Sequence, residues 1–192
     1  MVSQSVRLLR LRTKEVVLGT LVDLQQKHVD DFDSSWRSLL EEFSQEDKYW
    51  DWAFKKQIYL ESQRYEGYAI EWENQTQGLM IIETQWHRSQ LNMGKRIVYV
   101  VALAAAPWNR ATMQKPPEFK GVGAALLLFA RQRSVELGYA GRVGLHSLPQ
   151  AERFYEGQKM MRYDVEPSGS DSDEYIDPEE EHLTYFEYPP LR

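Results

Sequence analysis

The stretch that decides the fold runs from residue 98 to residue 155 and contains three informative segments. It begins with the apolar run Val98-Tyr-Val-Val-Ala-Leu-Ala-Ala-Ala-Pro107. After an irregular proline-rich segment it continues with Lys120-Gly-Val-Gly-Ala-Ala-Leu-Leu-Leu-Phe-Ala130, and it closes with Gly144-Leu-His-Ser-Leu-Pro-Gln-Ala-Glu-Arg-Phe-Tyr155. This order predicts a buried strand, a glycine turn that opens a helix, and a second strand that leads into a second helix.

The glycine turn has the chemistry of an anion site. Gly121 and Gly123 give the backbone freedom for a tight turn and allow close approach of a ligand. The first N–H groups of the following helix have no partner within the helix, and the helix dipole adds partial positive charge there. Lys120 adds a cation directly before the turn. The segment therefore favours a phosphate-bearing cofactor, although a turn of this kind also occurs where a helix start merely packs closely.

Two common nucleotide motifs do not fit this turn. A Walker loop needs Lys and Ser or Thr after its last glycine, whereas Gly123 is followed by Ala124 and Ala125. A dinucleotide fingerprint needs Gly or Ala at its sixth position, where Leu126 stands, and it opens a parallel βαβ unit. A phosphate-bearing cofactor bound at this turn would thus be of another kind.

The segments around the turn predict an antiparallel meander with helices before and after it. Residues 65–72, 79–86 and 96–104 are rich in β-branched and aromatic side chains and are joined by short polar turns. A helix over residues 124–137 should end at Gly138. The fold class is therefore α+β, or mixed α/β. Further strands are expected over residues 5–11, 142–146, 161–165 and 182–188.

Helix starts are predicted from polar residues that precede apolar runs. Residues 13–27 are expected to be helical, and Asp33-Ser34 is expected to cap a following helix. Ser44, with Asp47 three residues later, has the form of a capping box for the next helix. The segment 147–150 has the same form and should start the helix that carries Phe154 and Tyr155. The aromatic residues of the N-terminal helices are expected to lie in the core.

Composition places limits on the class of protein. With 192 residues, 42% of them hydrophobic, the chain is expected to form one globular domain. The absence of cysteine excludes thiolate metal sites and removes any need for an oxidising compartment. No signal-peptide pattern is found, and the longest apolar run, residues 97–108, is too short to cross a bilayer. We therefore expect a cytoplasmic protein without a membrane partner.

The net charge of −6 is unevenly distributed. Residues 164–181 contain nine acids and no Lys or Arg, which leaves 20 acids against 23 bases elsewhere. Those bases are not clustered as in nucleic-acid-binding proteins, so no nucleic-acid partner is expected. The acidic segment is interpreted as a solvated loop, with electrostatic steering of a cationic substrate as the alternative.

Two motifs within the stretch resemble the GNAT N-acetyltransferase superfamily. Glu118-Phe-Lys-Gly-Val-Gly123 is similar to its signature turn, Arg/Gln-x-x-Gly-x-Gly/Ala, and Ala151-x-x-Phe-Tyr-Glu156 is similar to its later helix. The resemblance covers roughly residues 65–188. It implies a GNAT-like, mostly antiparallel central sheet with N-terminal helices and two helices after the cofactor turn. The single acyltransferase domain, residues 1–192, would comprise an N-terminal strand and helices (1–64), the meander (65–106), the CoA-binding turn and helices (107–160), and C-terminal strands (161–192) with an acidic loop (166–181).

The resemblance also implies a cofactor and site residues. Acetyl-CoA (CoA) would be the co-substrate, without a metal, and Tyr155 would protonate the departing thiolate. The acceptor would be a small-molecule or peptide amine that attacks the thioester directly. Alternatives are a non-catalytic acyl-CoA-binding sensor or interaction module on the same fold, and a relative that has lost CoA. The pantetheine arm would bind backbone groups of Leu103, Ala104 and Ala105, and the pyrophosphate those of Lys120, Gly121, Val122, Gly123, Ala124 and Ala125.

The sequence departs from the family pattern in ways that affect the chemistry. Glu118 stands where the motif has Arg or Gln, so Arg110, Lys115 or Lys120 would have to neutralise the phosphates. The apolar strand has no carboxylate to serve as general base. Glu83 and His146 are the candidates for that role, with a solvated strand face and a structural role as their respective alternatives. The acceptor and the oligomeric state, for which a dimer is one option, are left open.

Overall fold

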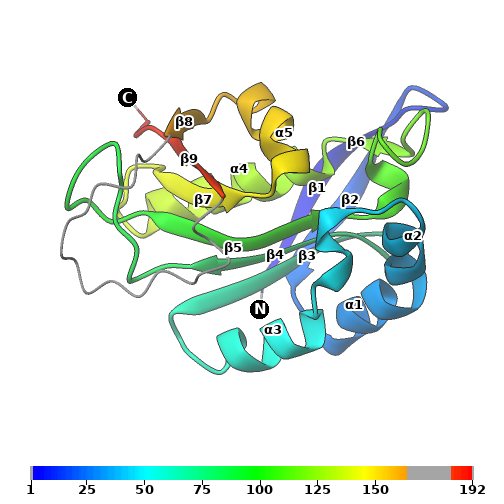
Figure 1. Ribbon diagram of the computed structural model, residues 1–192, viewed down its shortest axis with the longest axis horizontal. Coiled ribbons are helices and arrows are strands. Elements are labelled where there is room, and N and C mark those ends of the chain that lie inside the picture. The colour runs from blue at the N-terminus through cyan, green and yellow to red at the C-terminus, as the bar shows by residue number, and fades with distance from the viewer. Residues whose placement is uncertain (1, 164–182, 192) are drawn as a thin grey trace.

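A mixed nine-stranded sheet forms the centre of the part of the protein that the computed structural model describes, residues 2–163 and 183–191 (Figure 1). The strand order is β6-β1-β2-β3-β4-β5-β7-β9-β8, and every neighbouring pair is antiparallel except β5 and β7. The strands are β1 (Ser3–Arg10), β2 (Glu15–Asp23), β3 (Tyr65–Trp72), β4 (Gln75–Glu83), β5 (Val98–Ala105), β6 (Phe119–Lys120), β7 (Val143–Ser147), β8 (Met161–Tyr163) and β9 (Thr184–Tyr188).

Helices cover both faces of the sheet (Figure 1). On one face lie α1 (Gln26–Asp31), a π-helical turn (Phe32–Trp36), α2 (Arg37–Glu42), the 3-10 turn η2 (Glu46–Tyr49) and α3 (Trp52–Leu60). On the other face lie α4 (Val122–Glu136) and α5 (Glu152–Gly157). Two further 3-10 turns, η3 (Pro107–Asn109) and η4 (Pro149–Ala151), follow β5 and β7. The mixed α/β class and the helices on either side of the sheet confirm the predicted fold class.

Each face of the sheet has its own apolar core. Under α4, side chains such as Leu8, Met80 and Leu126 are fully buried. Under α1 to α3 the corresponding core contains Trp36 and Trp52, as predicted for the aromatic residues of the N-terminal helices. The same prediction is wrong for Phe43 and Phe54, which are exposed. Because both faces are covered, β4 is buried along almost its whole length, as its continuous apolar sequence requires.

A bulge in β5 opens the sheet beside its only parallel pair of described strands. Ile81 of β4 lies opposite Ala102, whereas the next residue, Ile82, lies opposite Val100, so Val101 is an extra residue on β5. β5 pairs with β7 at two positions near its start and at none beyond Tyr99. A bulge bends its strand and increases the twist. The second half of β5 therefore diverges from β7 and leaves a gap in the middle of the sheet.

Two elements of the N-terminal region differ from the prediction. Residues 15–23 form strand β2, where a helix was expected, because Val16, Val17 and Val22 favour the extended backbone and the segment pairs along its length with β1. The following helix begins at Gln26, so Asp33 and Ser34 lie inside a continuous helical segment and cap nothing.

The expected capping boxes are also wrong. Ser44 has a φ of +50° after the end of α2, and α3 is capped by Asp51, whose carboxylate accepts a hydrogen bond of 2.8 Å from the N–H of Phe54. Ser147 is the last residue of β7, and Leu148 is the residue before η4. The glycine turn is preceded by a short strand that the sequence did not reveal, β6, which pairs with the end of β1.

The strands predicted around the glycine turn are confirmed with shifted ends, and α4 ends before Gly138, which has a φ of +79°. The acidic loop predicted over residues 166–181 lies outside the described residues. Among the described residues, no helix has the length and apolar character needed to span a membrane.

Candidate active site

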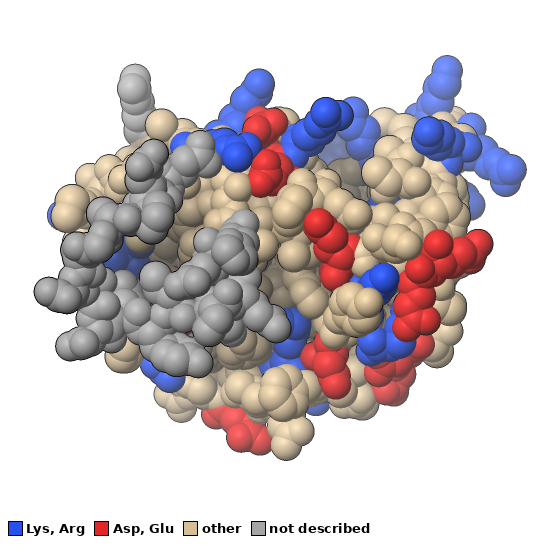
Figure 2. Space-filling model, in the orientation of Figure 1, with Lys and Arg blue, Asp and Glu red and all other residues tan. Residues whose placement is uncertain are grey.

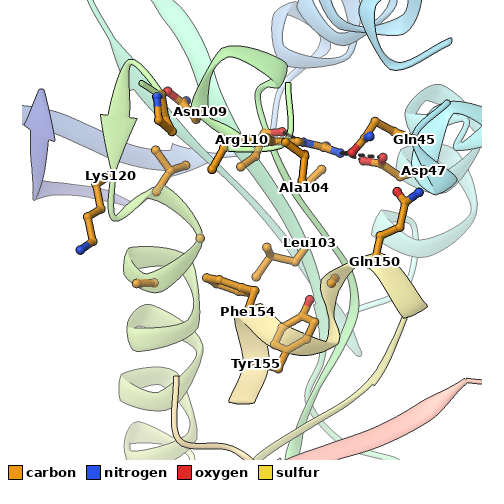
Figure 3. A pocket seen from close by; sticks show the side chains of 18 of the residues that line it. Gln45, Asp47, Leu103, Ala104, Asn109, Arg110, Lys120, Gln150, Phe154 and Tyr155 are labelled. Carbon is orange, nitrogen blue, oxygen red and sulfur yellow. Dashed lines mark hydrogen bonds and ion pairs between the residues drawn. The ribbon is translucent and has the colours of Figure 1, made fainter. Parts of the chain in front are cut away.

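A pocket of about 620 Å³ occupies the gap between β5 and β7. The second half of β5 and the start of α4 form one part of its wall, and α5 with the preceding η4 forms another. Residues of η2, from the opposite face of the sheet, close the far end (Figure 3). The pocket thus passes through the sheet at the point where the strands separate. It is the kind of cleft, mostly apolar with a few polar groups, that binds small ligands.

The glycine turn forms one end of the pocket. Gly121 precedes α4 with a φ of +106°, a conformation that side chains with a Cβ rarely adopt. The first helical hydrogen bond joins the N–H of Ala125 to the carbonyl of Gly121 at 2.8 Å. The N–H groups of Val122, Gly123 and Ala124 therefore have no acceptor within the helix, and all three residues line the pocket. This end can accept an anion.

The free edge of β5 forms the adjacent wall. Beyond Tyr99 the β7 side of β5 has no strand partner, and Leu103, Ala104 and Ala105 line the pocket there. One of the acceptors on this wall, the carbonyl of Ala105, is occupied by Arg110 Nε at 2.9 Å. An unpaired strand edge offers backbone donors and acceptors to an extended, amide-containing ligand.

Together the β5 edge and the glycine turn fit a CoA ester. The edge suits the amide groups of pantetheine, and the free N–H groups at the start of α4 suit its pyrophosphate. The predicted cofactor-binding residues therefore lie together, because the structure brings all of them except Ala125 to the pocket wall.

Tyr155 of α5 lies in the same pocket. Its ring packs against Phe154 and Phe186, only 6% of the residue is exposed, and its hydroxyl points into the cavity (Figure 3). Burial raises the pKa of Tyr155 above its ordinary value, the negative charge of Asp47 adds to the rise, and Arg110 opposes it. The hydroxyl is consequently protonated at neutral pH and can donate a hydrogen bond.

The close contact between α5 and the glycine turn explains why residue 123 is a glycine. An ideal Cβ on Gly123 would lie 2.8 Å from the Cζ atom of Phe154. A side chain at this position would push α5, and with it Tyr155, away from the start of α4. The glycine pair therefore serves two needs, since Gly121 allows the turn and Gly123 allows the helix that carries Tyr155 to approach.

Glu83, one of the two predicted bases, is not part of the pocket wall. It is fully buried at the end of β4, so it does not lie on a solvated strand face either. Its carboxylate accepts hydrogen bonds from the His87 ring at 2.8 Å and from three backbone N–H groups, of Gln85, Trp86 and His87. Burial alone would raise the pKa of Glu83, but these hydrogen bonds outweigh it and hold the pKa below its usual value.

His146, the other predicted base, also lies outside the pocket wall. It points to the opposite side of β7 from Leu145, and its Nδ1 is 2.7 Å from the Tyr99 hydroxyl. Burial and the nearby charge of His87 lower the pKa of His146 to about 4. It is therefore a neutral imidazole at pH 7, and the structure does not bring it together with Tyr155 in the pocket.

An ion pair that the sequence did not reveal closes the far end of the pocket. Arg110 donates to both carboxylate oxygens of Asp47, at 2.8 and 2.6 Å (Figure 3). Next to it, Glu46 and Gln150 bond reciprocally: the N–H of Gln150 donates to Glu46 Oε2 at 2.9 Å, and the N–H of Glu46 to Gln150 Oε1 at 3.3 Å. Local sequence patterns could not have found these partners, because they are 63 and 104 residues apart.

The ion pairs around the pocket determine which of the three predicted cations is available to a phosphate at the glycine turn. Glu118, the unusual residue of the motif, is paired with Arg10 at 3.4 Å and does not line the pocket. Arg110 is engaged by Asp47 and the β5 carbonyl, and Lys115 is not on the pocket wall. Among the three predicted candidates, Lys120 is the one that lies at the glycine-turn end without an ion-pair partner in the described residues.

Comparison with known proteins finds solved structures of the same fold and no match among protein-family models or curated proteins. Many solved structures do match the fold. The GNAT domain of PAT from S. lividans is 13% identical with a TM-score of 0.59, and the match covers 97% of this chain and 96% of that one.

Two further structures show the same fold. Ard1 from Thermoplasma volcanium is 14% identical with a TM-score of 0.56, and the match covers 92% of this chain and all of that one. The aminoglycoside N-acetyltransferase AAC(6')-Iy, solved with a bisubstrate analogue of CoA and acetylneamine, is 9% identical with a TM-score of 0.55. That match covers 80% of this chain and 98% of the other. The described residues therefore have the GNAT fold that the two sequence motifs predicted.

Proposed function

We propose that this chain, which has the GNAT fold, is an N-acetyltransferase that moves the acetyl group of acetyl-CoA to an amine. The observation that carries the proposal is the meeting of three features in one pocket. These are the free edge of β5, the unpaired N–H groups at the start of α4 and the Tyr155 hydroxyl. The comparison structures include an aminoglycoside N-acetyltransferase of the same fold that was solved with a CoA analogue, which supports the choice of co-substrate.

In the proposed reaction the neutral amine attacks the thioester carbonyl. The C–N bond forms, the C–S bond breaks, and the sulfur leaves with the electron pair of that bond. The Tyr155 hydroxyl, which points into the pocket, would donate a hydrogen bond to the sulfur as negative charge develops. Because burial raises its pKa, complete transfer of its proton to a thiolate, whose ordinary pKa is about 8.5, is uphill. Its contribution is therefore mainly stabilisation of charge in the transition state.

No side chain is proposed to accept the proton of the attacking amine. No histidine lines the pocket in the described part of the chain, and Asp47 is engaged by Arg110. We infer that the acceptor enters as the free amine and releases its proton to water. The value of kcat/KM should then rise with pH until the pKa of the acceptor amine is reached.

The test is a Tyr155→Phe variant with Tyr163→Phe, on the exposed strand β8, as its control. Loss of one hydrogen bond to a charged group should lower kcat about 10- to 100-fold, and acetyl-CoA affinity should stay within about twofold. Turnover is measured as thiol release with a panel of amines, and affinity by calorimetry. Unchanged turnover in Tyr155→Phe would remove Tyr155 from the mechanism.

A second candidate is a non-catalytic module that binds acyl-CoA. It is favoured by one observation, namely that both residues expected to act as base, Glu83 and His146, are held in other contacts away from the pocket. Such a module would bind acetyl-CoA in the calorimeter and release no thiol with any amine of the panel.

A further inference from the structure

Four charged residues line the pocket in the described part of the chain, and two of them neutralise each other. Asp47 and Arg110 form a bidentate pair with little solvent exposure. The other two, Glu46 and Lys120, have no oppositely charged partner among the described residues. The pocket wall therefore carries one unpaired anion, Glu46, and one unpaired cation, Lys120, among the described residues.

These two charges lie in different parts of the pocket. Lys120 precedes α4 at the glycine turn. Glu46 belongs to η2 and is the neighbour in sequence of Asp47, which Figure 3 shows at the far end. The molecular surface shows a similar separation: Lys and Arg gather over the tip of the β1–β2 hairpin, and Asp and Glu over the N-terminal helices (Figure 2). The pocket thus has a cationic end and an anionic end.

The carboxylate of Glu46 is held at the pocket wall with one oxygen free. Its Oε2 accepts the N–H of Gln150, a residue that also lines the pocket, and its own N–H donates to the Gln150 side chain. No hydrogen bond to its Oε1 is found within residues 2–163 and 183–191. A carboxylate oxygen without a hydrogen bond can accept one from an ammonium group, and such charge-assisted bonds are stronger than neutral ones.

We propose that Glu46 binds a second cationic group of the acceptor, so that the preferred substrate is a diamine or polyamine. This inference rests on the proposed acetyl transfer. The nitrogen that attacks the thioester must be uncharged, so a lasting ion pair can form only with an amine that does not react. The cationic end binds the phosphates of the co-substrate, and the anionic end orients the acceptor by its remote charge.

The test uses Glu46→Gln, because the glutamine oxygen can still accept the N–H of Gln150 and only the charge is lost. Glu42→Gln, an exposed acid at the end of α2 outside the pocket wall, is the matched control. The probes are the triamine spermidine and the monoamine butylamine. Glu46→Gln should lower the ratio of kcat/KM for spermidine to that for butylamine about tenfold, mainly through KM for spermidine. Glu42→Gln should leave the ratio unchanged.

Calorimetry separates this inference from the proposed function. Acetyl-CoA binding is measured for wild type and Glu46→Gln, and spermidine binding for both with and without CoA. Loss of spermidine binding in Glu46→Gln with intact acetyl-CoA binding supports the inference. Equal spermidine binding, or an equal ratio of kcat/KM, in the two proteins overturns it, as does wild type that neither binds nor acetylates spermidine. Failure of wild type to bind acetyl-CoA overturns the proposed function, whatever spermidine does.

Discussion

Removing one partner of the Asp47–Arg110 pair should be one of the more destabilising single changes at the pocket. The side chains of Asp47 and Arg110 are only 7% and 17% exposed, and their two hydrogen bonds measure 2.8 and 2.6 Å. Removing one partner of a buried pair destabilises a protein by roughly 3–5 kcal/mol, because the other charge remains without compensation. Arg110 keeps its bond to the Ala105 carbonyl and some contact with water. We therefore expect Asp47→Ala to lower the free energy of unfolding by about 3 kcal/mol.

Urea unfolding measures this change directly. With an m value of about 3 kcal/mol/M, the midpoint should fall by about 1 M. A double-mutant cycle with Arg110→Ala should give a coupling energy of at least about 1.5 kcal/mol. The control is the exposed pair of Asp33 and Arg37, whose side chains are 44% and 32% exposed, and Asp33→Ala should lower stability by less than about 1 kcal/mol. An Asp47→Ala variant no less stable than Asp33→Ala would refute the reasoning.

Three more changes follow from the structure. Gly121→Ala, at a φ of +106°, should lower the free energy of unfolding by about 1–2 kcal/mol and weaken acetyl-CoA binding. Gly138→Ala, at a φ of +79° and outside the pocket, should lower the free energy of unfolding and leave binding intact. Urea unfolding measures the stability of both variants, and calorimetry measures their binding. The folded-state pKa of His146, about 4 against an ordinary 6.5, means that protonation favours the unfolded chain. The neutral His146 side chain thus makes its full contribution to stability above pH 6.5, and up to about 3 kcal/mol of that contribution is lost as the pH falls to 4. An NMR titration of His146 with a midpoint near 6.5 would contradict this. Glu83→Gln should lower the free energy of unfolding by about 2–3 kcal/mol in urea unfolding, because the amide replaces a buried carboxylate that accepts hydrogen bonds from His87 and three backbone N–H groups. A loss below about 0.5 kcal/mol, the usual effect of a surface substitution, would argue against it.

The sequence predicted those parts of the fold that depend on local chemistry. The glycine turn needs a backbone conformation that few residues other than glycine adopt, so Gly121 marked the start of α4. The meander needs alternating or continuous apolar strands with short turns, and those patterns are also local. In β2 the density of β-branched residues favours a strand, but the segment becomes one through its pairing with β1, a contact that the local sequence does not show.

The site was predictable on its cofactor side and not on its acceptor side. The predicted cofactor residues belong to two continuous segments, which the resemblance of the two motifs to the GNAT superfamily was enough to indicate, and the structure brings all of them except Ala125 to the pocket wall. Asp47 and Arg110 meet only because η2 and the segment after β5 lie on the same side of the opened sheet. Glu83 and His146 were predicted as bases, and the structure shows that each is held by a partner outside the pocket, namely His87 and Tyr99.

The gap between β5 and β7 is the proposed binding site for acetyl-CoA. Calorimetric titration of the wild-type chain with acetyl-CoA tests it most directly. A single site per chain with a Kd between about 1 μM and 1 mM is the predicted result, in the range usual for enzyme substrates. The absence of any binding heat at millimolar acetyl-CoA, together with no change in thermal stability, would contradict it.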